Sequence, residues 1–410
     1  MMRLVHTRAA KDPTRDAAMS LLQRRPLVVI VIAQLFGTSL WFSVNGVWLA
    51  LAAELGLDEG DLGRLTLMVQ VGFILGTLTL ATTGLADRFS ASRVFAAASL
   101  LGALVNAGLV LAAPDASVAG VLRLLTGLCL AGIYPLGMKM VIAWTPAHAG
   151  AALAWLVGML TLGTATPHLM RSLTLGLPWE WVLLSASGLT LVGGALVLRL
   201  GDGPHLPPTA APIAWRGGLE ALRLPHFRAA AGGYFGHMWE LYAVWMLVPL
   251  LVAREISRLD AAAGLVPMLS YLIIGIGVVG CVMGGQLSRS RGSAWVAARA
   301  LAISGTLCLA YPVLAALGTS PLVLIALLFL WGLAVIADSP QFSALASASA
   351  PSHRVGASLA IMNAIGFGLS IPAIWLTGHL WASQGPWVLL WLLPGPVLGL
   401  WALGQRPSAA

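Results

Sequence analysis

The sequence predicts an all-α integral membrane protein in which twelve transmembrane helices form two pseudo-symmetric six-helix bundles. Hydrophobic residues make up 59% of the 410-residue chain and charged residues only 9%, against roughly 25% charged in a typical soluble domain. The apolar residues fall into about twelve stretches of about 20 residues or more, the length that a helix needs to cross ~30 Å of hydrocarbon. Helices are expected because a helix satisfies its own backbone groups where no water is present.

A polar segment rich in proline divides the stretches six and six. The expected layout is a cytoplasmic tail at 1–25, a first bundle at 26–200, a linker at 201–226, a second bundle at 227–404 and a tail at 405–410. The predicted spans are Leu27–Ala53, Leu62–Gly84, Val94–Ala113, Val118–Trp144, Ala151–Leu173, Trp181–Leu200, Phe227–Ala253, Gly264–Leu287, Trp295–Leu317, Pro321–Ala346, Gly356–Leu380 and Trp387–Leu403.

The basic residues predict the orientation. Most of the 23 Lys and Arg residues fall on the side of the N-terminus. The other side holds Arg64, Arg123, Arg171, Arg254 and Arg258, while Lys139 lies inside a span. Basic loops stay cytoplasmic, so both termini are expected in the cytoplasm and the protein in the inner (plasma) membrane. This topology accounts for the net charge of +8, and no nucleic-acid partner is expected.

Two motifs carry a resemblance to a known family. Thr83-Gly84-Leu85-Ala86-Asp87-Arg88-Phe89-Ser90-Ala91-Ser92-Arg93 joins the second and third spans, and Gly285–Arg289 occupies the corresponding place in the second half. Arg123-Leu124-Leu125-Thr126-Gly127 places an arginine four residues before a glycine in the fourth span. The first motif resembles the signature loop of the major facilitator superfamily, with Thr83 and Ser90 where glycine is usual, and the second is similar to its helix 4 motif. Parallel repeats of this kind are a known transporter plan.

The resemblance implies a secondary transporter that moves a small solute by alternating access. It also implies a cavity lined by the first, fourth, seventh and tenth spans. Gly84, Asp87, Arg88 and Arg93 would form a gating loop, in which Asp87 anchors one half against the other in one access state. The alternative is an ordinary loop kept in the cytoplasm by its arginines.

Charges at membrane depth are costly, so each one indicates a partner or a task. Glu240 and His237 lie three residues apart in the seventh span and share a helix face. A desolvated carboxylate beside a histidine is suited to carry a proton. The alternative is a buried pair that fixes helix packing.

Asp338 lies in the tenth span, where Pro340 is expected to kink the helix toward a cavity. Lys139 in the fourth span corresponds to Gln341, one turn from Asp338. Lys139 and Asp338 are therefore expected to attract each other across the cavity, as an inner gate or a substrate site. Alternatively, Lys139 extends to the membrane interface.

Three further polar residues complete the candidate pathway. The resemblance implies that Arg123 helps to couple protons, although it could equally anchor the fourth span at the interface. Asn45 lies in the first span and Tyr242 in the seventh. Lys139 and Arg123 give the expected cavity a basic character, so the sequence favours a small anionic solute driven by protons.

Two other functions remain open at this point: proton-driven efflux of drugs or hydrophobic metabolites, and a membrane-embedded sensor or enzyme. The chain has no GxxxxGK[ST] loop and no HExxH motif, and Cys129, Cys281 and Cys308 lie apart inside spans. We therefore expect no enzymatic activity, no cofactor and no metal. The expected partners are a small solute, protons and the bilayer, and the expected state is a monomer.

Overall fold

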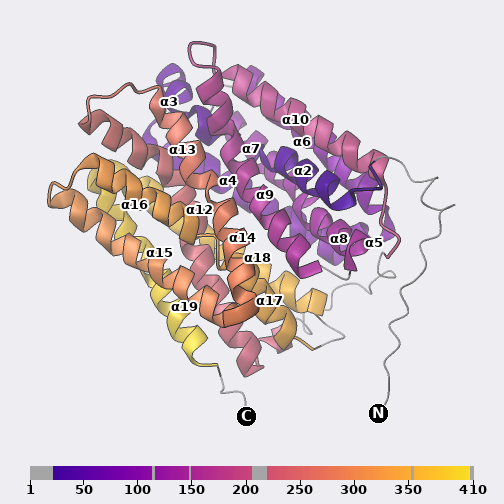
Figure 1. The fold of residues 1–410 in the computed structure, drawn as a ribbon. Coiled ribbons are helices and arrows are strands. Elements are labelled where there is room, and N and C mark those ends of the chain that lie inside the picture. Colours follow the sequence, from indigo (N-terminus) through magenta and orange to yellow (C-terminus); the bar gives the residue numbers. More distant parts are fainter. Residues whose placement is uncertain (1–21, 113–115, 147–148, 206–218, 352–354, 407–410) are drawn as a thin grey trace, which may run out of the picture.

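The computed structural model describes residues 22–112, 116–146, 149–205, 219–351 and 355–406, and all regular structure within them is helical. The N-terminal bundle contains α2 (Pro26–Thr38), α3 (Ser43–Leu55), α4 (Glu59–Thr83), α5 (Leu85–Arg88), α6 (Ala91–Ala112), α7 (Ala116–Ala131), α8 (Tyr134–Trp144), α9 (Ala149–Leu173) and α10 (Glu180–Leu200). In Figure 1 these elements run from indigo to pink. Much of the expected linker, at 206–218, lies outside the described residues.

The C-terminal bundle follows, from rose (α12) through orange to yellow (Figure 1). It contains α12 (Pro225–Arg258), α13 (Leu265–Gly275), α14 (Gly277–Arg291), α15 (Ser293–Ala316), α16 (Pro321–Ala334), α17 (Ser339–Ser349), α18 (Val355–Gln384), the 3-10 helix η3 (Gly385–Leu392) and α19 (Pro394–Gly404). We call the end of the molecule at which α2 begins and α19 ends the inner end, following the charge-based orientation, and the opposite end the outer end.

Eleven helical stretches in the described residues are long and apolar enough to cross a membrane. The last of them, Val355–Gly404, has 50 residues and contains the eleventh and twelfth predicted spans. Gly385, with φ of 54°, separates the two. The twelfth span begins as the 3-10 helix η3, and Pro394 then starts α19. The predicted membrane fold is therefore confirmed, with one span less regular than expected.

Four spans are broken in the middle. The fourth span breaks between α7 and α8, at Gly132–Ile133, and the tenth between α16 and α17, at Val335–Asp338. The starts of these two breaks are separated by the 202-residue repeat of the sequence to within one residue. The first span breaks between α2 and α3 and the eighth between α13 and α14. In a membrane, broken helices occur where the freed backbone groups find partners or line a cavity.

Close helix contacts explain Gly127, the glycine of the fourth-span motif. α4 packs against α7, and a Cβ added to Gly127 would lie 2.1 Å from the carbonyl oxygen of Val69. A Cβ added to Gly72 would lie 1.9 Å from that of Leu124. Neither position can hold a side chain without moving the backbones apart. Packing between α4 and α7 thus requires the glycine at position 127.

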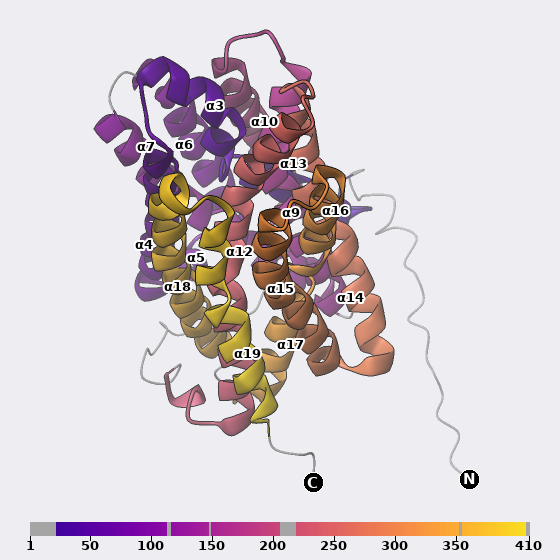
Figure 2. The ribbon, with the colours of Figure 1, turned by 90° about the vertical axis from the view of Figure 1, so that its left-hand side faces the viewer.

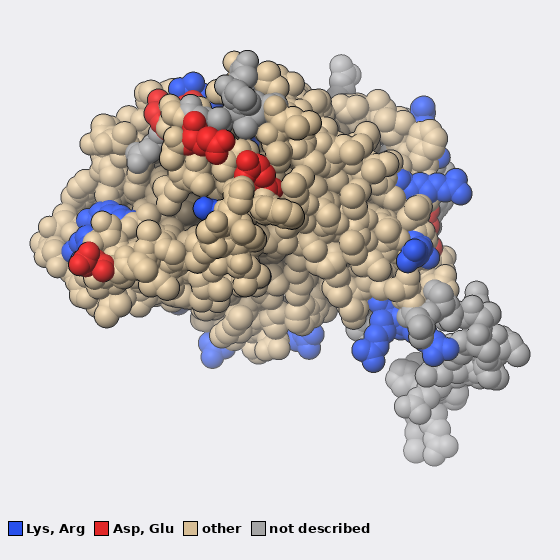
Figure 3. Space-filling model, turned by 90° about the horizontal axis from the view of Figure 1, so that it is seen from above, with Lys and Arg blue, Asp and Glu red and all other residues tan. Residues whose placement is uncertain are grey.

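The two bundles meet along two seams. α4 runs beside α18, as Figure 2 shows, and α9 packs along α13 and α14. At the outer end of the first seam, Gly63 and Gly378 face each other closely. Farther in, the Gln70 amide donates a hydrogen bond of 2.9 Å to the Ser370 hydroxyl. Most of the surface seen in Figure 3 is uncharged, with acidic side chains gathered toward the left of that view.

Candidate functional site

Three titratable side chains are buried together in the C-terminal bundle. His237 and Glu240 lie on α12, and Asp338 lies in the break before α17; each is fully buried. The predicted break of the tenth span near Pro340 is confirmed, since Pro340 stands in the first turn of α17. The His237 Nδ1 atom lies 2.8 Å from Asp338 Oδ1. Asp338 thus forms an ion pair with His237 on α12, and its predicted attraction to Lys139 on α8 stays a prediction.

Glu240 faces a different neighbour from the one expected. The Cys308 thiol on α15 donates to Glu240 Oε2 at 3.5 Å, and the Ser304 hydroxyl, one turn away, also contacts this carboxyl. His237 and Glu240 share one side of α12 but pair with separate partners. The structure thus brings His237 to Asp338 and Glu240 to Cys308 and Ser304.

The polar atoms of this cluster have few partners. Glu240 Oε1, both oxygens of Asp338 and the ring nitrogens of His237 have no aligned hydrogen bond. The close His237–Asp338 contact is thus an ion pair in which the oxygen lies off the N–H direction. Most buried polar groups in proteins are hydrogen-bonded, and exceptions need an explanation. A carboxyl that binds and releases a proton is one such explanation.

Arg123 has a different environment. It is fully buried on α7, and its guanidinium faces the interior of the bundle. Its Nη1 donates to the Leu40 carbonyl at 3.0 Å and to the Ser43 hydroxyl at 3.2 Å, and its Nη2 donates to the Trp41 carbonyl. Leu40 and Trp41 lie in the break between α2 and α3. The guanidinium therefore satisfies backbone acceptors that the broken first span leaves open.

The network around Arg123 continues through the N-terminal bundle. The Ser43 hydroxyl donates to Asn106 Oδ1 at 2.7 Å, and Asn106 Nδ2 donates to the Ser187 hydroxyl at 3.0 Å. These contacts join α7, α3, α6 and α10. Asn106 was missed by sequence reasoning, although a polar amide in an apolar span was a usable signal.

An aromatic cluster fills the centre between the bundles. Trp41 stacks on Tyr242 with ring centroids 5.4 Å apart, and Phe367 lies 6.0 Å from Trp41 and 5.5 Å from Tyr242. Phe73 on α4 approaches Phe367 to 4.6 Å. The Trp41 indole N–H also donates to Gln70 Oε1 at 2.8 Å. We call Trp41, Phe73, Tyr242 and Phe367 the central aromatic cluster; it joins the break in the first span to the C-terminal bundle.

A cavity of about 230 Å³ lies between the bundles toward the outer end. It is lined by α3, α9, α12 and α13, and Asn45, Trp48, His168 and Ser270 reach it. Asn45 donates to the Thr66 hydroxyl at 3.0 Å, but its Oδ1 and the Nε2 of His168 have no partner. Asn45 therefore belongs to the outer part of the interface and lies apart from the buried carboxyls.

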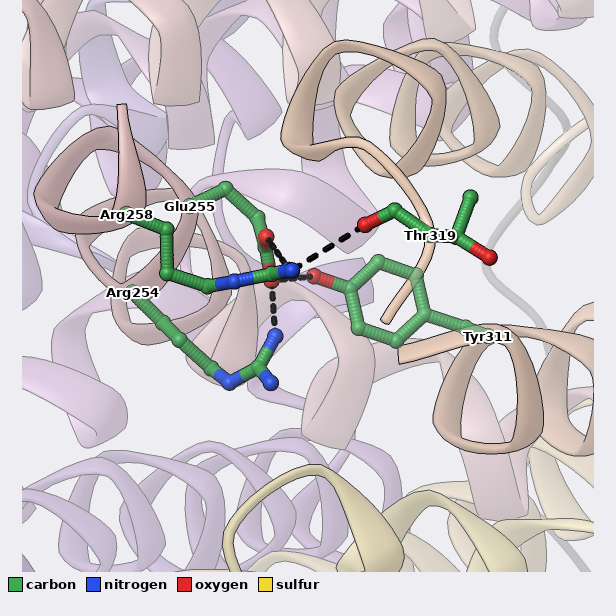
Figure 4. Close-up of polar contacts among 5 residues, drawn as sticks. All are labelled: Arg254, Glu255, Arg258, Tyr311 and Thr319. Carbon is green, nitrogen blue, oxygen red and sulfur yellow. Dashed lines mark hydrogen bonds and ion pairs between the residues drawn. The ribbon is translucent and has the colours of Figure 1, made fainter. Parts of the chain in front are cut away.

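A second buried glutamate on α12 is fully provided with donors, as Figure 4 shows. Glu255 accepts from Arg254, from Arg258 at 2.6 Å and from the Tyr311 hydroxyl at 3.0 Å. Arg258 also donates to the Thr319 carbonyl at 3.1 Å. These contacts fasten the outer end of α12 to α15 and to the turn that follows it. Glu255 thus stabilises the packing of α12 against α15.

The loop after α4 follows its motif in part. Gly84, with φ of 65°, ends α4 in the left-handed region, where glycine is favoured. Arg88 and Arg93 are exposed; the Asp87 side chain lies outside the described part of the structure. Asp202, just after α10, accepts the Ser92 N–H at 2.7 Å in the first turn of α6. Burial raises the Asp202 pKa, but hydrogen bonds from Ser90, Ala91 and Ser92 outweigh it, and the pKa falls below the ordinary value.

The remaining candidates lie on the inner side of the two central breaks. Lys139 is half-buried on α8, and Gln341 is buried on α17. Sequence reasoning overlooked Gln34 and Gln70, which are completely buried on α2 and α4. The amide atoms of Gln34 have no partner. Like a charge, a glutamine in an otherwise apolar span is costly to place in the membrane, so the sequence alone could have indicated these two residues.

Comparisons with known proteins agree on one family. A sequence model described as the Major Facilitator Superfamily matches residues 29–374. A solved structure of the xylose transporter XylE from E. coli, in a partially occluded inward-open conformation, superimposes with a TM-score of 0.73. The two chains are 12% identical, and the match covers 93% of this chain and 97% of that one. No curated protein matches the sequence.

Proposed function

Because the chain belongs to the major facilitator superfamily, we propose that it is a secondary transporter that couples proton movement to the passage of a small organic solute between its two bundles. The observation that carries the coupling is the buried set of Glu240, Asp338 and His237, in which Glu240 Oε1 has no hydrogen-bond partner and Asp338 is held by His237. Ionised carboxyls without partners are costly at this depth, so each access state favours a protonated or a deprotonated form.

The coupling proposal assigns a step to each residue. Glu240 binds the proton, since its close donors among the described residues are a thiol and a hydroxyl. Asp338 stands in the break of the tenth span and is held by His237, so a change in its charge alters the contact between α12 and the break. Proton binding is thereby linked to the movement of helix segments. Arg123 acts by holding the first-span break in place rather than by carrying a proton.

For the solute, the central aromatic cluster favours a molecule with an apolar or aromatic face. Four aromatic rings converge where the broken first span meets the C-terminal bundle. Such rings bind flat apolar bodies by offset stacking. One of the two basic residues behind the expectation of a small anion, Arg123, is engaged with backbone carbonyls. Efflux of a hydrophobic metabolite or drug is therefore the favoured form of the transport.

A small anion remains the second candidate because Lys139 lies half-buried on α8. The two solutes are separated by the residue on which transport depends. Tyr242→Ala weakens transport of an aromatic solute, whereas Lys139→Ala weakens transport of an anion. Gln341, on the repeat position of Lys139, would contact either solute.

We further propose that the transporter is a monomer in the inner membrane with both termini in the cytoplasm. The distribution of arginines favours this topology. The loop of Gly84, Asp87, Arg88 and Arg93 is proposed as the gate at the inner end. The hydrogen bond from Gln70 to Ser370 is one contact between the bundles that must change when they rock.

The coupling is tested in proteoliposomes with the solute found by a thermal-shift screen. Glu240→Gln is expected to reduce uptake driven by a pH gradient at least tenfold, because the amide cannot take up a proton. It should leave solute exchange at equal pH within about twofold of wild type. Glu255→Gln is the matched control, since it alters a carboxyl of the same helix that has all its donors. Full pH-driven flux in Glu240→Gln would refute the assignment.

A further inference from the structure

Two grooves open on the outside of the C-terminal bundle, on either side of Trp295. One, of about 590 Å³, lies between α14, α15 and α16 and is lined mostly by apolar side chains such as Met283 and Ile303. The other, of about 560 Å³, lies between α15 and α19, beside Leu400 and Arg406. Trp295, at the start of α15, lines both. Neither groove belongs to the interface between the bundles.

Basic side chains surround the point where the grooves meet. The guanidinium groups of Arg291 and Arg299 lie 5.5 Å and 5.4 Å from the centre of the Trp295 ring. Arg299 also lines the larger groove, and Arg406 and His226 line the smaller. Stacking on the indole keeps both arginines close together while their N–H groups remain available to a ligand. The result is a compact positive site at the inner end of a hydrophobic surface.

The position of the grooves identifies the chemistry of the occupant. Both begin at the level of Trp295, where an interfacial tryptophan is expected, and the larger one runs along α15 and α16 to Ile303 and Leu330. An acyl chain fits this apolar path, and a phosphodiester is the anion that two guanidinium groups bind well. Basic pockets between spans on the cytoplasmic side are suited to anionic lipid headgroups.

We propose that this surface binds an anionic phospholipid. The headgroup phosphate lies on Arg291 and Arg299, one acyl chain occupies the groove between α14, α15 and α16, and the second lies toward α19. The occupant is a lipid rather than a soluble phosphate because the larger groove is lined mostly by apolar side chains and opens on the outside of the bundle. The proposal is independent of the solute and of the proton path.

The test uses the purified full chain in a neutral detergent, with bound lipid counted by native mass spectrometry. Phosphatidylglycerol is expected to be retained in preference to phosphatidylcholine with the same acyl chains. In Arg291→Gln/Arg299→Gln the apparent affinity for phosphatidylglycerol falls, by about fivefold for each arginine and roughly thirtyfold for both. Met283→Trp, which fills the larger groove, lowers the affinity although both arginines remain. Arg199→Gln, an exposed arginine at the inner end of α10, leaves it unchanged.

Several results would overturn the proposal. Equal retention of the two lipids by the wild type would do so, as would an equal loss in Arg199→Gln, since the effect would then be one of net charge. Competition by water-soluble glycerophosphoglycerol at the same concentration as the lipid would show that the groove contributes nothing. If Met283→Trp instead changed the oligomeric mass, the surface would be an interface between copies of the chain.

Discussion

The buried charges near the middle of the two bundles, Arg123 in one and Glu240 with Asp338 in the other, have different surroundings. In the N-terminal bundle, Arg123 is surrounded by acceptors from the broken first span. In the C-terminal bundle, Glu240 Oε1 has no hydrogen-bond partner, and Asp338 lies against His237, a residue type that itself titrates near neutral pH in water. The repeat of 202 residues places Ile325 where the first bundle has Arg123, and it places the break of the first span on α12, which is unbroken.

This difference separates a buried charge that supports the fold from buried charges that are suited to bind protons. A broken helix needs donors or acceptors from elsewhere, and a single arginine fork can supply them in the N-terminal bundle. The intact α12 needs no such support, so Glu240 on it is available for other work, whereas Glu255 on the same helix is held by Arg254, Arg258 and Tyr311. We infer that the N-terminal bundle uses its cation to hold a shape, whereas the C-terminal bundle uses its carboxyls to respond to protons.

The sharpest way to break the comparison is to remove the cation. Arg123→Met leaves the carbonyls of Leu40 and Trp41 and the Ser43 hydroxyl without their donor. Because each buried polar atom left unpaired costs about 1–3 kcal/mol, the free energy of unfolding is expected to fall by about 2–5 kcal/mol. The measurement is unfolding of the purified protein followed by tryptophan fluorescence.

The control for this prediction introduces the same replacement, methionine, at the repeat position, which holds Ile325. Ile325→Met replaces one buried apolar side chain by another of similar volume, so it should cost less than about 1.5 kcal/mol. A folded Arg123→Met protein with wild-type stability but without pH-driven flux would place Arg123 in the proton path instead.

The two glutamates of α12 sharpen the comparison within one helix. Glu255→Gln weakens charge-assisted contacts to Arg254, Arg258 and Tyr311, and hydrogen bonds to charged groups contribute about 1.5–3 kcal/mol. A loss of that size in the free energy of unfolding is expected, with coupling between protons and solute preserved. Glu240→Gln should not destabilise the fold, since it removes a buried carboxyl that has few donors. If both variants lost stability equally, the distinction between packing and proton-binding glutamates would fail.

Much of the architecture could be predicted from sequence because span length and the distribution of arginines are local properties. The break near Asp338 was also predictable, since Pro340 cannot donate to a continuous helix. The break at Ser39–Phe42 was not, because no proline lies there and its partner, Arg123, comes from another helix. The pairing of His237 with Asp338 was missed for the same reason: spacing along α12 gives the face of a residue but not the helix opposite.

The smallest expected effect concerns Asp202, where the N-terminal bundle ends. Its carboxylate accepts the Ser92 N–H at the start of α6, and these hydrogen bonds lower its pKa despite partial burial. A group with a lowered pKa in the folded state stabilises the fold above its unfolded pKa of about 4, and the contribution is lost as the pH falls through the folded value. Asp202→Asn should therefore cost less than about 1 kcal/mol at pH 7, as is usual for a charge at a helix N-terminus. Thermal unfolding of both proteins should show this difference shrinking below pH 4, while a difference that grew on acidification would mean that Asp202 binds α6 in its protonated form.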